Sequence, residues 1–250
     1  MTSPLLATAV IPARIASSRF PGKMLAAETG QPLVCHVVEA VLRADRIGDV
    51  IVATDDERIA AAAVGAGAQA VMTRGDHVNG TSRIAEVIKM HGDRLADRIV
   101  NVQGDEPEID PALIDLLVDR LDADPEVDMA TLGSPFAHGE DVADPNITKV
   151  VCDVKGRALY FSRAAIPFDR DGDGVTVLKH AGLYAYRTAF VLHYARLAPT
   201  PLEEAEKLEQ LRVLEHGHAI AVATATIQHH GIDTPAQYAA FVARFRAGRG

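Results

Sequence analysis

The chain has 250 residues, which is enough for one large α/β domain or two small ones with a sizeable buried core. With 34 acidic and 25 basic residues, its formal net charge is −9. This charge argues against a general nucleic-acid surface and requires any anionic ligand to meet a local cluster of cations. No uncharged apolar run reaches the roughly 18 residues of a membrane span, and the first residues lack the basic segment of a signal peptide. Cys35 and Cys152 show no CxxC spacing, so we expect reduced thiols in a cytoplasmic protein without membrane insertion.

The first half of the chain alternates short apolar runs with amphipathic segments. The pattern predicts strands at 8–12, 49–54, 69–73 and 98–103, and helices at 33–44, 56–67, 81–92 and 110–123. Asp110 and Pro111 are typical of the start of the last helix. This alternation predicts a mainly parallel sheet with right-handed crossovers, and its ligand site belongs at the carboxyl ends of the strands.

The second half is richer in strands. Runs at 128–135, 148–163 and 180–187 favour antiparallel pairing, with a hairpin that turns at Lys155–Gly156. Helices are expected at 188–197, 201–217 and 234–248, with a strand at 219–226 between the last two. Because no long linker divides the chain, we expect a single domain, 1–250, with a β-rich insertion at about 129–186.

Three short motifs resemble known binding sites, but their sequence context does not favour those functions. A GxGxxA pattern at 65–70 follows a helix and precedes a strand, which is the reverse of the order in a dinucleotide site. The segment 169–174 opens like a calcium loop, but its twelfth position is His180 instead of glutamate. The histidines at 216, 218, 229 and 230 lack a cysteine or carboxylate at zinc-ligand spacing. We therefore expect a helix end, a solvated turn and ordinary loop histidines.

The segment IPARIASSRFPGK follows the first predicted strand and concentrates positive charge. Arg14 supplies a planar guanidinium group and Lys23 a mobile ammonium group. Ser17 and backbone amides can donate hydrogen bonds to phosphate oxygens. Pro12 and Ala13 lie at the strand end, where ligands of open α/β sheets bind. The segment does not satisfy the P-loop pattern. A basic surface loop is the alternative interpretation, and the loop alone does not decide between the two.

A second polar element, NVQGDEP, follows the strand predicted at 98–103. It places Gln103, Asp105 and Glu106 at a strand end, with Gly104 allowing a tight approach. A carboxylate opposite a cationic loop is a position where Mg²⁺ would bridge protein and phosphates. An aspartate-capped turn before a helix is the alternative. Because both elements belong at the same sheet edge, a nucleotide–metal site is favoured over coincidence.

The motifs IPARIASSRFPGK, MTRGDHVNGTSR, IVNVQGDEP, LYFSRAAIPFDRD, HAGLYAYR, PLEEAEKLEQLRVLEHG and GIDTP occur in one order along the chain. In these motifs the sequence resembles the 3-deoxy-manno-octulosonate (Kdo) cytidylyltransferases, from Ala9 to about Tyr238. The resemblance implies a Rossmann-like nucleotidyltransferase fold and the transfer of CMP from CTP to Kdo, giving CMP-Kdo and pyrophosphate for lipopolysaccharide assembly. It also implies Mg²⁺ as cofactor, CTP and Kdo as substrates, and a homodimer formed through the β-rich insertion.

The resemblance also implies roles for individual residues. Arg14, Lys23 and Asp105 would act on the reacting phosphates, and Asp105 and Asp233 would hold Mg²⁺. The nucleotide would be bound by Pro12, Ala13, Arg14, Ser17, Lys23, Thr73, Arg74, Gly80 and Thr81. The sugar would be bound by Gln103, Arg163, His180, Tyr184, Glu209 and Gln210, with Arg163 paired to the sugar carboxylate. For Tyr184, Glu209 and Gln210 the residue pattern alone favours structural roles.

The chain departs from the family pattern at two places: the first concerns a polar contact, and the second leaves the sugar open. Ser82 stands where many relatives have glutamate, and the segment 171–179 matches no fixed pattern just before His180. One alternative function is therefore a cytidylyltransferase for another acid sugar, either amino-substituted Kdo or a sialic-type acid. A second alternative is a nucleotide-binding module without catalysis, although both candidate metal aspartates are present.

Overall fold

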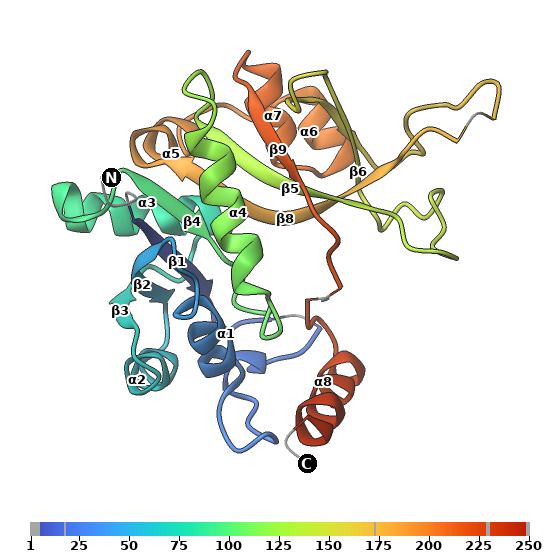
Figure 1. The fold of residues 1–250 in the computed structure, drawn as a ribbon. Helices are drawn as coiled ribbons and strands as arrows, with labels where there is room; N and C mark the ends of the chain where they lie inside the picture. Colours follow the sequence, from blue (N-terminus) through green and yellow to red (C-terminus); the bar gives the residue numbers. More distant parts are fainter. Residues whose placement is uncertain (1–5, 18, 173, 229–230, 249–250) are drawn as a thin grey trace. The chain divides into compact units, whose positions relative to one another are not determined.

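The computed structural model describes residues 6–17, 19–172, 174–228 and 231–248 (Figure 1). The chain divides into two compact units, residues 1–115 together with 228–250, and residues 116–227. The expectation of a single domain with an insertion at 129–186 stays a prediction, and each unit is treated by itself below. Within the described residues no helix is long and apolar enough to cross a membrane.

The sheet of the first unit consists of four parallel strands. Its order is β3 (Gln69–Met72), β2 (Ile47–Thr54), β1 (Ala7–Ala13) and β4 (Arg98–Asn101). β1 pairs in parallel with both β2 and β4, and β2 pairs in parallel with β3. Nearly every residue of β1 is buried, which explains its continuous apolar sequence, because a parallel strand is covered on both faces. The predicted parallel α/β organisation is confirmed.

The helices of this unit begin where the sequence provides caps. Asp56 accepts a hydrogen bond from the Arg58 amide at the start of α2 (Glu57–Gly65), and Asn79 accepts from the Ser82 amide at the start of α3 (Gly80–His91). Thr234 and Gln237 form a capping box at α8 (Pro235–Ala247). The first unit also contains α1 (Leu33–Val41) and the short 3-10 helices η1 (Lys23–Leu25) and η2 (Gly92–Arg94). The glycines at 65–67 close α2, as expected for a helix end.

The C-terminal helix is attached to the first unit by an apolar cluster. Leu33 of α1 packs with Ile232, Tyr238, Phe241 and Val242, and Phe20 lies partly buried against them. The ring of Phe20 is 5.5 Å from that of Tyr238. This packing fixes the segment that carries Asp233 beside the loop that follows β1, although the two are more than 200 positions apart in the sequence.

The second unit is rich in strands, as expected. β5 (Met129–Pro135) pairs antiparallel with β8 (Leu178–Arg187) and parallel with β9 (Ile220–Thr224). β6 (Lys149–Cys152) and β7 (Ala158–Ser162) form the predicted hairpin, and β6 also pairs with β8. α4 (Pro111–Asp122) crosses the boundary between the units, and the Oδ1 atom of Asp110 accepts from the Ala112 amide at its start. α5 (Thr188–Tyr194) follows β8.

The single helix predicted at 201–217 is wrong, because the structure has two helices there. α6 (Pro201–Glu206) ends at Lys207, which has φ 54° in the left-handed region, and α7 (Gln210–Glu215) begins three residues later. Lysine is an uncommon residue for a left-handed helix end, so the sequence gives little warning of the break. The break allows Leu208 and Gln210 to be buried while Glu209 remains exposed.

Candidate active site

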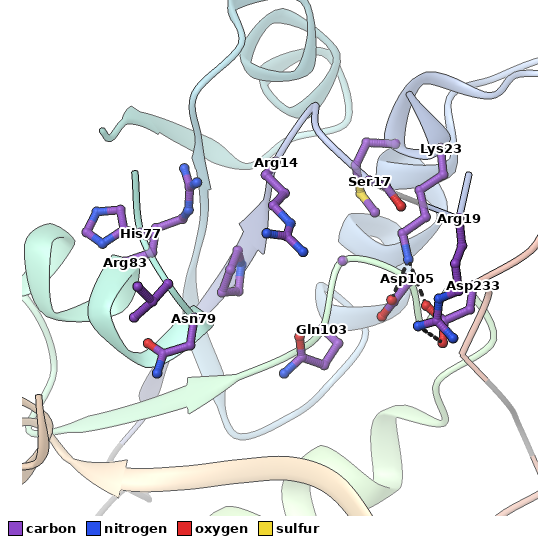
Figure 2. Close-up of a pocket in the computed structure, with 15 residues that line it drawn as sticks. Arg14, Ser17, Arg19, Lys23, His77, Asn79, Arg83, Gln103, Asp105 and Asp233 are labelled. Carbon is purple, nitrogen blue, oxygen red and sulfur yellow. Dashed lines mark hydrogen bonds and ion pairs between the residues drawn. The ribbon is translucent and has the colours of Figure 1, made fainter. Parts of the chain in front are cut away.

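A polar pocket lies in the first unit at the carboxyl ends of β1 and β4. Its lining comes from the loop after β1, the start of α3, the segment after β4 and the segment before α8 (Figure 2). The lining residues are Pro12, Arg14, Ser17, Arg19, Lys23, Met24, His77, Val78, Asn79, Gly80, Arg83, Gln103, Gly104, Asp105 and Asp233. The pocket therefore occupies the sheet edge at which ligands of parallel α/β folds bind.

Gly104 is required where the two strand ends meet. A Cβ atom at this position would lie 2.9 Å from the carbonyl oxygen of Pro12 and 3.1 Å from the sulfur of Met24. Any larger residue would push the Asp105 segment away from the loop after β1. The predicted tight approach at Gly104 is confirmed.

Lys23 is at the centre of the charged side of the pocket (Figure 2). Its Nζ atom donates to Asp105 Oδ2 at 2.6 Å, to the carbonyl oxygen of Ile232 at 2.9 Å and to Asp233 Oδ1 at 3.4 Å. The Lys23 side chain is only 10% exposed, so this ammonium is largely removed from water. Arg19 pairs with the other oxygen of Asp233 at 3.0 Å. One buried cation thus joins the two aspartates predicted as metal ligands.

The negative charge gathered here also acts on Glu106. Burial, together with the neighbouring carboxylates of Asp105 and Asp233, raises the pKa of Glu106 to about 7 against the opposing effect of Lys23. The carboxylates of Asp105 and Asp233 therefore still repel the charged form of Glu106 although Lys23 pairs with both of them. An additional cation would relieve this repulsion.

The donor set fits Mg²⁺. Asp105 and Asp233 are hard oxygen ligands, and their carboxylates lie close together because both contact the same Lys23 nitrogen. Among the described residues no group of three or more histidine, cysteine, aspartate or glutamate side chains could hold a metal ion. Mg²⁺ usually takes only one or two protein carboxylates and completes its shell with water and substrate phosphates. Two aspartates facing an open pocket match that requirement.

The opposite wall of the pocket comes from the start of α3 (Figure 2). His77 contacts Ser82 Oγ through Nδ1 at 3.0 Å and Glu86 Oε2 through Nε2. The Oγ atom of Ser82 also donates to the carbonyl oxygen of Asn79 at 2.9 Å. Ser82 thus helps to hold His77 and Asn79 in place.

A buried ion pair connects this wall to the loop after β1. Arg83, 3% exposed, donates to Thr73 Oγ1 at 2.6 Å and to Asp55 Oδ2 at 3.2 Å. The other oxygen of Asp55 accepts from the Ile15 amide at 3.1 Å. Asp55 therefore links the loop that carries Arg14 to the helix that carries Arg83.

Most of the predicted nucleotide and metal residues meet in this pocket. Those that line it are Pro12, Arg14, Ser17, Lys23, Gly80, Asp105 and Asp233, and Gln103, predicted to bind the sugar, lines it as well. Ala13 and Thr81 are buried outside the lining, and Thr73 is buried with its hydroxyl turned to the carbonyl of Thr54 at 3.2 Å. Arg74 forms an exposed pair with Asp76. The binding roles of all these residues stay predictions.

Several lining residues were not predicted from the sequence to belong to the site. They are Arg19, Met24, His77, Val78, Asn79 and Arg83. Arg83 offered the clearest signal, because it lies one turn before the apolar Val87 in a helix whose other buried residues are mostly apolar. A buried arginine requires a partner. That partner, Asp55, lies 28 positions earlier and could not be found from local patterns.

In the second unit, His180 and Tyr184 are brought together by a bulge in β8. Thr131 of β5 pairs with Tyr184 while the adjacent Leu132 pairs with Ala181, so Gly182 and Leu183 are extra residues in the strand. The rings of His180 and Tyr184 consequently lie 5.6 Å apart. In a regular strand, residues four positions apart are separated by about 13 Å.

Thr131 and Gln210 complete a group that we call the His180 cluster: Thr131, His180, Tyr184 and Gln210. Thr131 Oγ1 is 2.9 Å from His180 Nε2, and Gln210 Nε2 is 3.5 Å from His180 Nδ1. Burial lowers the pKa of His180 to about 3 and raises that of Tyr184 well above its usual value. The cluster is therefore neutral near pH 7. Glu209, the neighbour of Gln210, is exposed.

Arg163 directly follows β7. Hydrogen bonds from its guanidinium and to its backbone carbonyl hold it in place. Its Nε donates to the carbonyl oxygen of Glu206 at 2.7 Å and its Nη1 to that of Pro145 at 2.9 Å. The fully buried Lys149 donates to the carbonyl oxygens of Arg163, Ile147 and Asp144 at 2.6, 2.6 and 2.9 Å. Only two of the five N–H groups of the guanidinium are used in these bonds, so Arg163 retains donors for a carboxylate.

The motifs set aside from the sequence make local contacts where they are described. Asp169 accepts from the amides of Gly172, Gly174 and Val175, which makes an exposed turn. His218 contacts His193 at 3.2 Å, and His216 contacts the carbonyl of Ala198. His229 and His230 lie outside the described residues.

Comparison with known proteins identifies the family to which the chain is similar. A model of the family described as Cytidylyltransferase matches residues 8–220. Two curated relatives are named 3-deoxy-manno-octulosonate cytidylyltransferase. The one from Syntrophobacter fumaroxidans is 49% identical over 235 residues, covering 93% of this chain and 94% of that protein. The one from Geobacter sulfurreducens is 48% identical over 239 residues, covering 91% and 94%.

Solved structures agree with this assignment. A structure of CMP:2-keto-3-deoxy-manno-octonic acid synthetase complexed with CTP has a TM-score of 0.91 and 40% identity, and covers 97% of this chain and 99% of that chain. A cytidylyltransferase from Leptospira borgpetersenii has a TM-score of 0.61 at 15% identity over 96% and 86% of the two chains, a likeness that shows the fold alone. The chain belongs to the 3-deoxy-manno-octulosonate cytidylyltransferase family.

Proposed function

We propose that the protein transfers CMP from CTP to the anomeric hydroxyl of Kdo, giving CMP-Kdo and pyrophosphate. The observation that carries this proposal is the pocket of the first unit, which gathers Arg14, Lys23, Asp105 and Asp233 at the sheet edge in a member of this family. The product would feed lipopolysaccharide assembly. The relatives' names and the CTP complex of a similar enzyme support the choice of both substrates.

In the proposed reaction the hydroxyl oxygen forms a bond to the α-phosphorus as the bond from that phosphorus to the pyrophosphate oxygen breaks, and the hydroxyl proton passes to solvent. The obstacle is electrostatic, because a sugar carboxylate approaches a triphosphate and negative charge then grows on the leaving group. Arg14, Arg19 and Lys23 line one pocket and would stabilise that charge. The chain forms no covalent intermediate in this scheme, and it acts by positioning and by electrostatics.

We assign Asp105 and Asp233 as the residues that hold Mg²⁺ when CTP binds. The ion would supply positive charge at the phosphate oxygens and lower the pKa of the attacking hydroxyl. Lys23 contacts both aspartates in the structure and would turn toward the phosphates as the aspartates take the ion. The flexible lysine side chain makes such an exchange of partners possible.

Within the second unit, recognition of the sugar is assigned to Arg163, His180, Tyr184, Glu209 and Gln210, while Gln103, also predicted to bind the sugar, lines the pocket of the first unit. Arg163 retains N–H donors for the Kdo carboxylate, and the neutral His180, Tyr184 and Gln210 offer donors and acceptors for hydroxyl groups. Glu209 is exposed and can accept a hydrogen bond from a hydroxyl. A neutral set suits hydroxyl recognition because its groups can donate to or accept from a hydroxyl without burying a net charge.

We also propose a cytoplasmic homodimer. Cys35 and Cys152 are free thiols, which fits a reducing compartment. Val154, Leu159 and Phe168 are large exposed apolar residues within the β-rich insertion and are suitable for a contact with a second copy. Light scattering of the purified protein tests this part, and Phe168→Asp should shift a dimer toward monomer.

Pyrophosphate release measured with CTP and Mg²⁺ tests the proposed function directly. Kdo should be the preferred acceptor in a panel that also contains 8-amino-Kdo and a sialic acid. Preference for another acid sugar would replace Kdo as substrate. Binding of CTP without pyrophosphate release from any sugar would favour a non-catalytic nucleotide-binding module and overturn the proposal.

A further inference from the structure

Three hydrogen-bonding atoms surround the hydroxyl of Thr131, but the hydroxyl can donate to only one of them. Its Oγ1 lies 2.8 Å from the carbonyl oxygen of Leu183, 3.2 Å from that of Ala181 and 2.9 Å from His180 Nε2. The residue is fully buried, so water does not share these contacts. A hydroxyl has one hydrogen to donate and two lone pairs that accept.

The two carbonyl neighbours decide where that hydrogen goes. Carbonyl oxygens only accept, so a hydroxyl that donated to His180 would face both carbonyl oxygens with its lone pairs. Leaving buried acceptors without a donor is costly. When the hydroxyl donates to Leu183 instead, its oxygen can accept from His180, and Nε2 must then carry the hydrogen. Burial also disfavours the charged imidazolium, in which both ring nitrogens would donate.

The tautomer of His180 in turn fixes the orientation of Gln210. With the hydrogen on Nε2, the other ring nitrogen Nδ1 has a lone pair, and the group that faces it is the amide nitrogen of Gln210 at 3.5 Å. An amide NH₂ donates and an amide oxygen accepts, so the NH₂ side of Gln210 is turned to His180 and its carbonyl oxygen points away. Gln210 is itself 3% exposed, which limits alternative orientations.

We propose that Thr131 is a positioning residue that holds His180 as the Nε2–H tautomer and so orients the Gln210 amide to accept a hydrogen bond from a hydroxyl of the sugar. This inference rests on the proposed function for the identity of the ligand. The chain of hydrogen bonds runs from the Thr131 hydroxyl, which is held by the bulge carbonyls, through the imidazole ring to the amide. Thr131 itself touches no substrate in this arrangement.

Nitrogen-15 NMR of the full chain reads the tautomer without any activity measurement. With histidine labelled at both ring nitrogens, the His180 signal, identified by its loss in His180→Asn, should show a protonated Nε2 and an unprotonated Nδ1 near pH 7. A wild-type spectrum with the hydrogen on Nδ1 overturns the inference. This measurement needs only the wild-type fold and the one assignment variant.

Kinetics then test the positioning role. Thr131→Val removes the hydroxyl at nearly constant shape, so the His180 tautomer should change and the KM for Kdo should rise about tenfold, while the KM for CTP stays within about twofold. Thr131→Ser should restore both the tautomer and the KM. Thr148→Val is a matched control, since only the backbone carbonyl of Thr148 contacts the His180 amide, and it should change neither.

The outcomes separate the two proposals. An unchanged KM for Kdo in a folded Thr131→Val protein overturns the positioning role even if the tautomer is as stated. A KM for CTP that rises together with that for Kdo also overturns it, because general damage would then explain the effect. A wild-type protein that shows the Nε2–H tautomer but releases pyrophosphate with no acid sugar removes the proposed function and leaves the tautomer assignment intact.

Discussion

The two units differ in the charge of their candidate binding groups. The pocket of the first unit is built from full charges, with Lys23 joining Asp105 and Asp233 and with Arg14 and Arg19 beside them. The His180 cluster of the second unit is built from neutral groups whose charged forms burial disfavours. Each set suits a different ligand chemistry, since a polyphosphate needs compensating charge whereas hydroxyls need fixed donors and acceptors.

The difference follows from the local backbone. In the first unit, parallel strands end together, so polar residues that follow β1 and β4 meet at one open edge. In the second unit, a bulge within an antiparallel pair turns two aromatic side chains toward each other among buried neighbours. An open strand end can hold exposed ions, while the interior of a sheet favours paired neutral groups.

The largest expected effect is on turnover at the charged pocket. Asp105→Asn keeps the shape of the side chain and removes its charge, so turnover should fall about a hundredfold or more, as for the loss of one preorganised electrostatic contact. Steady-state pyrophosphate release at saturating CTP and Kdo measures this. Asp97→Asn, an exposed aspartate of the same unit, is the control and should be silent. A near-normal rate in folded Asp105→Asn would remove the catalytic role of this carboxylate.

Breaking the buried ion pair of the first unit should destabilise the fold. Arg83→Met leaves Asp55 buried without its guanidinium and should lower the free energy of unfolding by about 3 kcal/mol. Arg74→Met breaks an exposed pair in the same unit and should cost under about 1 kcal/mol. Urea denaturation of both variants checks the difference. Equal losses would mean that burial does not decide the strength of these pairs.

Glu106 should make the first unit less stable as pH rises. Its folded pKa of about 7 lies above the unfolded value of 4.5, so the native state binds the proton more tightly and stability falls between these two values. A shift of this size corresponds to about 3 kcal/mol at most. Glu106→Gln should remove this slope, so its gain in unfolding free energy over wild type should be larger at pH 8 than at pH 5. Parallel curves for the two proteins between pH 5 and 8 would contradict the assignment.

His180 should give the second unit the opposite dependence. Its folded pKa of about 3 lies below the unfolded value of 6.5, so the unfolded state binds the proton more tightly and stability is lost as pH falls below about 6.5. In the native protein the His180 ring signals should stay constant from pH 8 to pH 5, whereas an unperturbed histidine titrates near 6.5. A native His180 that titrates near pH 6 would show that the cluster is not neutral by burial.

Local sequence signals were sufficient for the strand-end residues of the first unit's pocket, but not for the wall at the start of α3 or for the supporting ion pair. Apolar runs followed by polar residues predicted β1, β4, Arg14, Lys23 and Asp105, because a strand end and the residues after it are adjacent in sequence. The pairing of Asp55 with Arg83 depends on tertiary packing and leaves no local pattern. The sugar residues of the second unit came from resemblance alone, since the bulge that joins His180 to Tyr184 has no signal beyond Gly182.

The smallest expected effect on stability concerns Arg19. Its pair with Asp233 is exposed, at 65% and 41% of the two side chains, and solvent screens such a pair, so Arg19→Ala should change the free energy of unfolding by less than about 1 kcal/mol. Because Arg19 lines the pocket, the same variant should raise the KM for CTP severalfold, more strongly at low salt, and leave that for Kdo unchanged. Arg43→Ala, an exposed arginine of the same unit that donates to the Glu39 carbonyl, should leave both KM values unchanged. If the two variants behave alike, Arg19 contributes nothing to nucleotide binding, and the charge contrast between the two units rests on Arg14 and Lys23.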